Sequence, residues 1–151
     1  MSSLAGALCA ELFGRTRPVV MPEIQSTFAV VWIAYELLPV CVDDDRALGA
    51  ALRSLLPSYR GPAKRLFRGT HAGECRPFGF SWSTDLERAL EFAQRSLERQ
   101  GPRGRAVVFE TVAPADTIIC AVSEAVGGSE HEFVVDGLRL GAVRVVRRFA
   151  S

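Results

Sequence analysis

Apolar residues follow a helical spacing in the first part of the chain. Between residues 22 and 38 they recur every three or four positions, at Ile24, Phe28, Val31, Trp32, Tyr35 and Leu38. This spacing predicts a helix, which Pro22 begins and Pro39 ends. Further apolar residues on the other side predict that this helix is buried on most of its faces.

A second helix is predicted directly after the first. Four leucines form its apolar stripe, at Leu48, Leu52, Leu55 and Leu56. Three consecutive aspartates at 43–45 precede the stripe, where carboxylates cap a helix and suit its positive N-terminal end. We interpret these aspartates as a helix cap rather than as metal ligands. Pro57 ends the helix.

Beyond residue 60 the pattern changes to short apolar runs between Gly and Pro residues, which is typical of strands. We predict strands at 65–69, 80–83, 106–112, 117–122, 132–135 and 142–149. One helix interrupts them, and its apolar face consists of Leu86, Ala89, Leu90, Ala93 and Leu97. Thr84 and Glu87, three residues apart, predict a capping box at the start of this helix.

This order of elements predicts an α+β fold with a mixed or antiparallel sheet. The chain has 151 residues, which fits a single domain over 1–151. A helical part would span 1–60 and a β-rich part 61–151. Neither a G-x-G-x-x-G motif nor a P-loop occurs in the sequence, so any nucleotide would be bound in another way.

Charge and cysteine usage exclude several classes of protein. The 18 basic and 17 acidic residues leave a net charge of +1. A domain that binds nucleic acid mainly through its overall charge is usually much more basic. The four dispersed cysteines have no zinc spacing, and we expect no metal. The apolar run at 28–42 is too short to cross a bilayer. We expect a soluble, cytoplasmic protein, or one delivered into a target cell without a conventional signal peptide.

The first segment that is a candidate for a chemical role is the end of the predicted strand, at Arg68. Gly69 follows at once, and a glycine allows the backbone to turn sharply or to approach a ligand closely. An arginine at such a turn can be aimed at a phosphate. Thr70 is the next polar residue of this segment. Taken by itself, the segment also fits an arginine that merely precedes a turn.

The second segment is the strand at 80–83. Alternation puts Ser81 and Ser83 on one face and Phe80 and Trp82 on the other. Two neighbouring hydroxyls can hold a polar ligand or a nearby carboxylate. The simpler interpretation is that Thr84 caps the following helix while Trp82 lies in the core.

The third segment contains Glu130 and Glu132, which are two residues apart on a predicted strand and so share a face. Carboxylates beside a sugar can stabilise an oxocarbenium ion and activate a nucleophile. The alternative is an edge strand with two solvated glutamates.

Together, these three segments resemble the arginine–serine–glutamate class of mono-ADP-ribosyltransferases. Their order is Arg-Gly at 68–69, a Gly-Phe-Ser-Trp-Ser-Thr strand leading into a helix with Phe-Ala at 92–93, and Glu-x-Glu at 130–132. The likeness is to small bacterial or phage proteins and covers about residues 64–149. It implies a split β-sandwich that follows the N-terminal helices and binds NAD, as co-substrate, between two sheets, without a metal.

The resemblance also implies roles for individual residues. Arg68 would contact the phosphates or ribose of NAD, with Gly69 and Thr70 beside it. Ser83 and Thr84 would match the Ser-Thr-Ser motif of the family, with Asp85 in place of its last serine, and the choice between Ser81 and Ser83 as the residue facing NAD stays open. Glu132 would be the catalytic glutamate. Glu130 would be its upstream partner, which in that family goes with arginine as the acceptor.

The activity implied is transfer of ADP-ribose to a macromolecular target, a protein (for example at arginine) or a nucleic acid. The protein would act as a toxin, effector or phage modifier, with an antitoxin or immunity protein as a further partner and no membrane partner. The N-terminal helices would pack behind the sheet or recognise a partner. Two alternatives are an NAD glycohydrolase on the same fold and a non-catalytic module that binds a partner; Glu130 favours transfer.

Overall fold

A computed structural model of the chain describes residues 21–34, 44–73, 78–127 and 131–150. The described chain has an α+β fold, as the sequence predicts. Its helices are α2 (Pro22–Ala34), α4 (Asp45–Leu55), α5 (Leu86–Gln100) and α6 (Val122–Val126), with short 3-10 turns η1 (Gly101–Arg103) and η2 (Gly137–Arg139). Its strands are β1 (Lys64–His71), β2 (Ser81–Ser83), β3 (Arg105–Ala113), β4 (Ile118–Ala121), β5 (Glu132–Val135) and β6 (Val143–Ala150).

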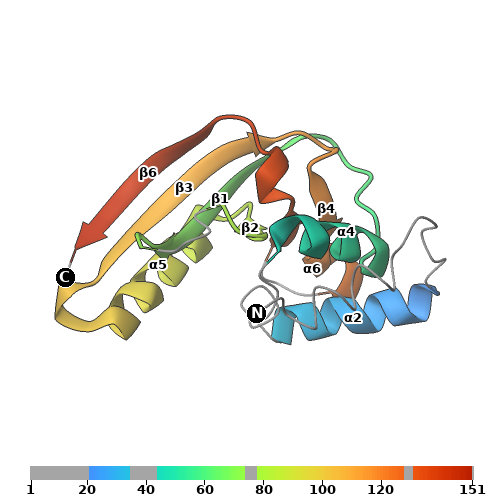
Figure 1. The fold of residues 1–151 in the computed structure, drawn as a ribbon, viewed down its shortest axis with the longest axis horizontal. Helices are drawn as coiled ribbons and strands as arrows, with labels where there is room; N and C mark the ends of the chain where they lie inside the picture. The colour runs from blue at the N-terminus through green and yellow to red at the C-terminus, as the bar shows by residue number, and fades with distance from the viewer. Residues whose placement is uncertain (1–20, 35–43, 74–77, 128–130, 151) are drawn as a thin grey trace.

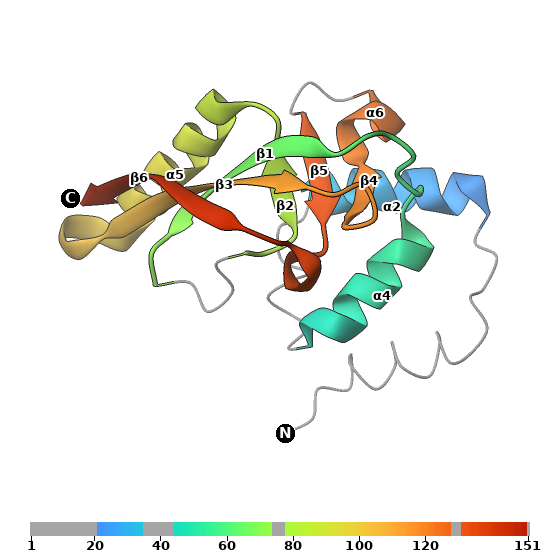
Figure 2. The ribbon, with the colours of Figure 1, turned by 90° about the horizontal axis from the view of Figure 1, so that it is seen from above.

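The six strands form one antiparallel sheet in the order β4-β5-β2-β1-β3-β6. β1 pairs with β3 along its whole length, but it pairs with β2 at one position, where Phe67 faces Ser83. The sheet arches over its helices (Figure 1): α5 lies under β1, β3 and β6, and the other helices gather around the β4 end. The view from above separates the same two groups of helices (Figure 2).

Three apolar clusters hold this arrangement together. One packs α5 against β1 and β3 through Phe67, Ala89 and Ala93. A second joins α2, α4 and α6 to β4 and β5. The third lies on the opposite face of the sheet, with Leu66 and Trp82 at its centre. Residues 66 and 67 therefore serve different clusters, as alternation along a strand requires.

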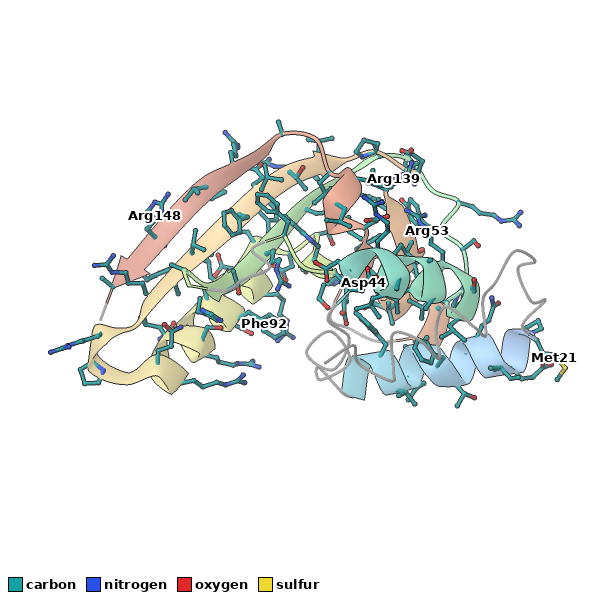
Figure 3. All side chains as sticks on the ribbon, viewed as in Figure 1. Met21, Asp44, Arg53, Phe92, Arg139 and Arg148 are labelled. Atoms are coloured by element: carbon teal, nitrogen blue, oxygen red, sulfur yellow. The ribbon has the colours of Figure 1, made fainter. Side chains whose placement is uncertain are left out.

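Polar contacts fix the position of α4. Asp44 caps this helix as predicted, because its Oδ1 accepts hydrogen bonds from the backbone N–H groups of Arg46 and Ala47, both at 2.9 Å. The guanidinium of Arg53 reaches Asp136 at 3.3 Å. Figure 3 shows Asp44 at the start of α4 and Arg53 further along the helix. Asp43 and the predicted end of the preceding helix at Pro39 lie outside the described residues.

Several of the predicted boundaries are wrong. The strand predicted at 65–69 continues to His71, so Arg68 and Gly69 lie inside β1 and not at a strand end beside a turn. The strand predicted at 80–83 begins at Ser81.

The cap of α5 is Asp85 rather than Thr84, because the Asp85 carboxylate accepts the Glu87 N–H at 2.9 Å. The predicted strand at 117–122 ends at Ala121, where the chain turns into the short helix α6. Gly127 closes α6 in the left-handed region, at φ +73°, which glycine adopts without strain.

The burial predicted for α2 is also wrong. Ala29 and Trp32 are buried, but Ile24 and Val30 keep about half of their surface exposed, at 51% and 55%. A helix at the margin of a small domain has a neighbour on one side, so apolar spacing alone overestimated its burial. Within the described ranges, no helix is long and apolar enough to span a membrane.

Candidate active site

The pairing of β1, β2 and β5 brings the three sequence segments onto neighbouring strands. Ser83 on β2 faces Glu132 on β5, and on the other side it faces Phe67 of β1, the residue before Arg68. Residues far apart in the sequence thus meet across three adjacent strands. Glu130 lies outside the described residues.

Ser83 and Glu132 share one face of the sheet, because directly opposed residues of an antiparallel pair project to the same side. Ser83 is buried, and its Oγ accepts the backbone N–H of Asp85 at 3.0 Å. Glu132 is half-buried. Its backbone N–H donates to Ser123 Oγ at 2.9 Å, and its Oε1 accepts the indole N–H of Trp32 at 3.1 Å. Both the backbone and the side-chain carboxylate of Glu132 are therefore held by hydrogen bonds.

The register settles which serine lies beside the carboxylate. Ser81 faces Val134, two residues further along β5, whereas Ser83 faces Glu132 directly. The hydroxyl next to the candidate catalytic carboxylate is therefore that of Ser83. Thr84 is exposed, and its backbone N–H donates to the carbonyl of His131 at 3.3 Å. This bond ties the start of α5 to the start of β5.

Arg68 lies where β1 and β2 separate. Its Nη1 donates to the carbonyl of Ser81 at 2.9 Å, and its Nη2 lies against Gly79, where an added Cβ would come within 2.7 Å. Alternation along β1 sends Arg68 to the face opposite Phe67, and so to the face opposite Ser83. The structure thus brings Arg68 to a strand adjacent to those of the other two residues, but not to the same face of the sheet.

Gly69 and Thr70 both lie inside the paired part of β1. A Cβ on Gly69 would lie 1.8 Å from the carbonyl oxygen of Ala89, so this glycine is what lets α5 approach β1 so closely. Thr70 is buried at 5% exposure and faces Val107 of β3. The close approach of α5 therefore accounts for the glycine at position 69.

The prediction that Phe80 and Trp82 share a face is wrong. Trp82 packs with Leu66 and Phe133, whereas Phe80 packs with Trp32 in the cluster on the other face. Phe80 precedes the first residue of β2, so the alternation of that strand does not extend to it. The Trp82 indole donates to the carbonyl of Gly79 at 2.8 Å, which helps to fix the backbone beside Arg68.

A buried thiol lies near the carboxylate. Burial, together with the negative charges of Glu132 and Glu124, raises the pKa of Cys120 to about 12. The Cys120 thiol is therefore neutral at physiological pH, which makes it a poor nucleophile. This neighbour of Glu132 contributes packing rather than chemistry.

Sequence reasoning missed two residues that hold Glu132, which are Trp32 and Ser123. Trp32 precedes Glu132 by 100 residues, and its helical spacing predicted a core side chain only. Ser123 follows a predicted strand residue, and the turn into α6 that presents its hydroxyl has no strong sequence signal. Long-range partners of this kind become visible only when the chain is folded.

Comparison with known proteins gives no relative: no protein-family model, no curated protein and no solved structure matches the chain. Function is therefore inferred from the residues and their arrangement.

Proposed function

We propose that the protein is a mono-ADP-ribosyltransferase that cleaves NAD at the nicotinamide–ribose bond and transfers ADP-ribose to a macromolecular acceptor. The observation that carries the proposal is the pairing of Ser83 with Glu132 across β2 and β5, with Arg68 on the next strand. Three motifs of the class it resembles thus lie on adjacent strands, with Ser83 and Glu132 on one face of the sheet and Arg68 on the other. The single β1–β2 register position also supports a sheet divided into two parts, β4-β5-β2 and β1-β3-β6.

The proposed chemistry is a substitution at the anomeric carbon of the ribose. The carbon–nitrogen bond to nicotinamide breaks, and its electron pair leaves with the nicotinamide, which becomes neutral. The ribose develops oxocarbenium character. The acceptor then donates an electron pair to the same carbon and loses a proton. The transition state therefore carries positive charge on the ribose, which a fixed carboxylate stabilises.

Glu132 is suited to this role because its carboxylate is already oriented in the protein. A preorganised negative group avoids the cost of reorganisation at the moment of reaction. The Ser83 hydroxyl, on the same face, would help to hold the ribose or the carboxylate. Arg68 reaches the start of β2 through Ser81 and Gly79. In the proposal its guanidinium binds the NAD phosphates from this point, with the bidentate geometry that Arg offers to such groups.

The proposal is tested by incubating the protein with NAD labelled in its adenylate part, with and without a cell lysate. Released nicotinamide reports cleavage, and mass spectrometry of the labelled material identifies the modified residue. The test compares Glu132→Gln with Glu124→Gln, the same substitution at an exposed glutamate on α6. We expect the first variant to lose cleavage and the second to retain it.

Each of the other outcomes points to a different function. Cleavage of NAD without labelling of any macromolecule would indicate a glycohydrolase with water as acceptor. A folded protein that neither binds nor cleaves NAD would contradict the proposal and favour a module that binds a partner.

A further inference from the structure

The N-terminal helix α2 reaches the candidate active site through one side chain. The indole Nε1 of Trp32 lies 3.1 Å from Oε1 of Glu132 and donates a hydrogen bond to it. We propose that Trp32 is a positioning residue for the catalytic carboxylate, an inference that rests on the proposed function. It assigns α2, which carries no sequence motif, to the active site.

Trp32 is well placed to hold a group in a fixed direction. Its side chain is 4% exposed and packs among Ala29, Leu52 and Phe80. The ring meets that of Phe80 edge-to-face, with centroids 6.5 Å apart. A tryptophan fixed on its ring faces has one direction in which its N–H can donate, and in this structure that direction ends on Glu132.

The hydrogen bond has a consequence for the carboxylate. A bond to one carboxylate oxygen restricts rotation about the terminal bond of Glu132, so both oxygens acquire a defined direction. The bond from Glu132 N–H to Ser123 Oγ fixes the backbone of the same residue. A carboxylate held in this way meets the ribose in one orientation, and loss of orientation slows catalysis more than it weakens binding.

The contact itself can be tested by nuclear magnetic resonance without NAD. The chain has two tryptophans, and each gives one indole N–H signal. Trp32 donates to a carboxylate, whereas Trp82 donates to the carbonyl of Gly79. In Glu132→Gln the first acceptor loses its charge, so the Trp32 signal should move while the Trp82 signal stays in place as an internal control. An unmoved Trp32 signal would overturn the inference.

The positioning role is tested by Trp32→Phe, which keeps an aromatic ring in the cluster and removes the N–H. We expect kcat for nicotinamide release to fall roughly 10- to 100-fold, the effect of losing a hydrogen bond to a charged group, with KM for NAD nearly unchanged. The matched control is Ile119→Val, which removes a methyl group from the same cluster and should leave kcat unchanged. An equal fall in both variants would show that Trp32 acts through packing alone, against the inference.

A double variant separates action through Glu132 from a general effect. If Trp32 acts by orienting this carboxylate, Trp32→Phe should have little further effect in a Glu132→Gln background. The same fold-loss in both backgrounds would overturn the positioning role. If the spectrum shows the contact but the wild-type protein cleaves no NAD, the positioning role falls together with the proposed function. If NAD is cleaved and the contact is absent, this inference fails and the proposed function stands.

Discussion

Replacement of Gly69 by alanine tests the packing on which the candidate site is built. An added Cβ would lie 1.8 Å from the Ala89 carbonyl oxygen and 2.7 Å from the Ala93 nitrogen. Both atoms belong to the backbone of α5, so no side chain can rotate away to make room. To restore ordinary van der Waals contact, which begins at 3.4 Å, the helix would move by about 1.6 Å.

The cost of this movement can be worked out from the packing. α5 carries one of the three apolar clusters, and overpacking of such a core costs about 1–3 kcal/mol. Because the obstacle is backbone, we expect the upper end, about 3 kcal/mol. For a domain of this size the melting temperature should fall by about 6–12 °C. Thermal unfolding monitored by circular dichroism measures this fall in melting temperature directly.

The matched control is Gly141→Ala. A Cβ at this position would meet no atom within 4 Å, so the substitution should change stability by less than about 1 kcal/mol, through the unfolded chain. The reasoning is refuted if Gly69→Ala melts within a degree of the wild-type protein. That result would show that α5 does not lie against β1 as described, and it would favour the proposed role of Gly69 beside NAD.

Three further predictions concern charged residues. Arg68→Lys should weaken NAD binding measured by calorimetry, because an ammonium cannot make the paired hydrogen bonds of a guanidinium; equal affinity would contradict a role for Arg68 in binding the NAD phosphates. Glu130→Gln should lower the rate of transfer to an acceptor more than the rate of hydrolysis by water, because a cationic acceptor must be oriented and deprotonated before it attacks. A parallel fall in both rates would contradict a role for Glu130 that is specific to transfer. Burial alone would raise the pKa of Glu110, but hydrogen bonds from Arg65 and Arg144 hold it below its ordinary value. The ionised form of Glu110 therefore adds stability that is present above the unfolded-state pKa and is lost as the pH falls through the lower folded-state pKa. Denaturant titrations between neutral and acidic pH should show a smaller loss of stability on acidification in Glu110→Gln, and equal pH dependence would contradict the assignment.

Local patterns predicted most elements of the fold. The strand at 132–135 and the cap at Asp44 depend on nearby residues, and both are confirmed. The capping error at α5 shows the limit of such patterns. Thr84 and Asp85 are both good caps by type, and the choice depends on Ser83, whose Oγ accepts the Asp85 N–H and forms the turn before the helix.

The geometry of the candidate site is harder to predict from the sequence than the fold. The order of Arg68, Ser83 and Glu132 predicted that they belong together, but it could not predict which side of the sheet each would take. Arg68 and Phe67 project to opposite faces because they are consecutive on β1, and the face shared by Phe67 and Ser83 is set by the register between β1 and β2. The hydrogen bond between Trp32 and Glu132 depends on how α2 packs against the rest of the protein. The spacing of apolar residues does not predict this packing, because Ile24 and Val30 fit the apolar pattern and yet are exposed.

The most direct test of the central claim is the rate of nicotinamide release from NAD by the wild-type protein and by Glu132→Gln. The substitution keeps the shape of the side chain and removes its charge. Loss of one such electrostatic contact lowers the rate by roughly 10²- to 10³-fold, about 3–4 kcal/mol. We predict measurable release by the wild-type protein and a fall of this size in the variant, with both proteins folded by circular dichroism. Equal rates in the two proteins, or no release by the wild-type protein with any acceptor, would contradict the account.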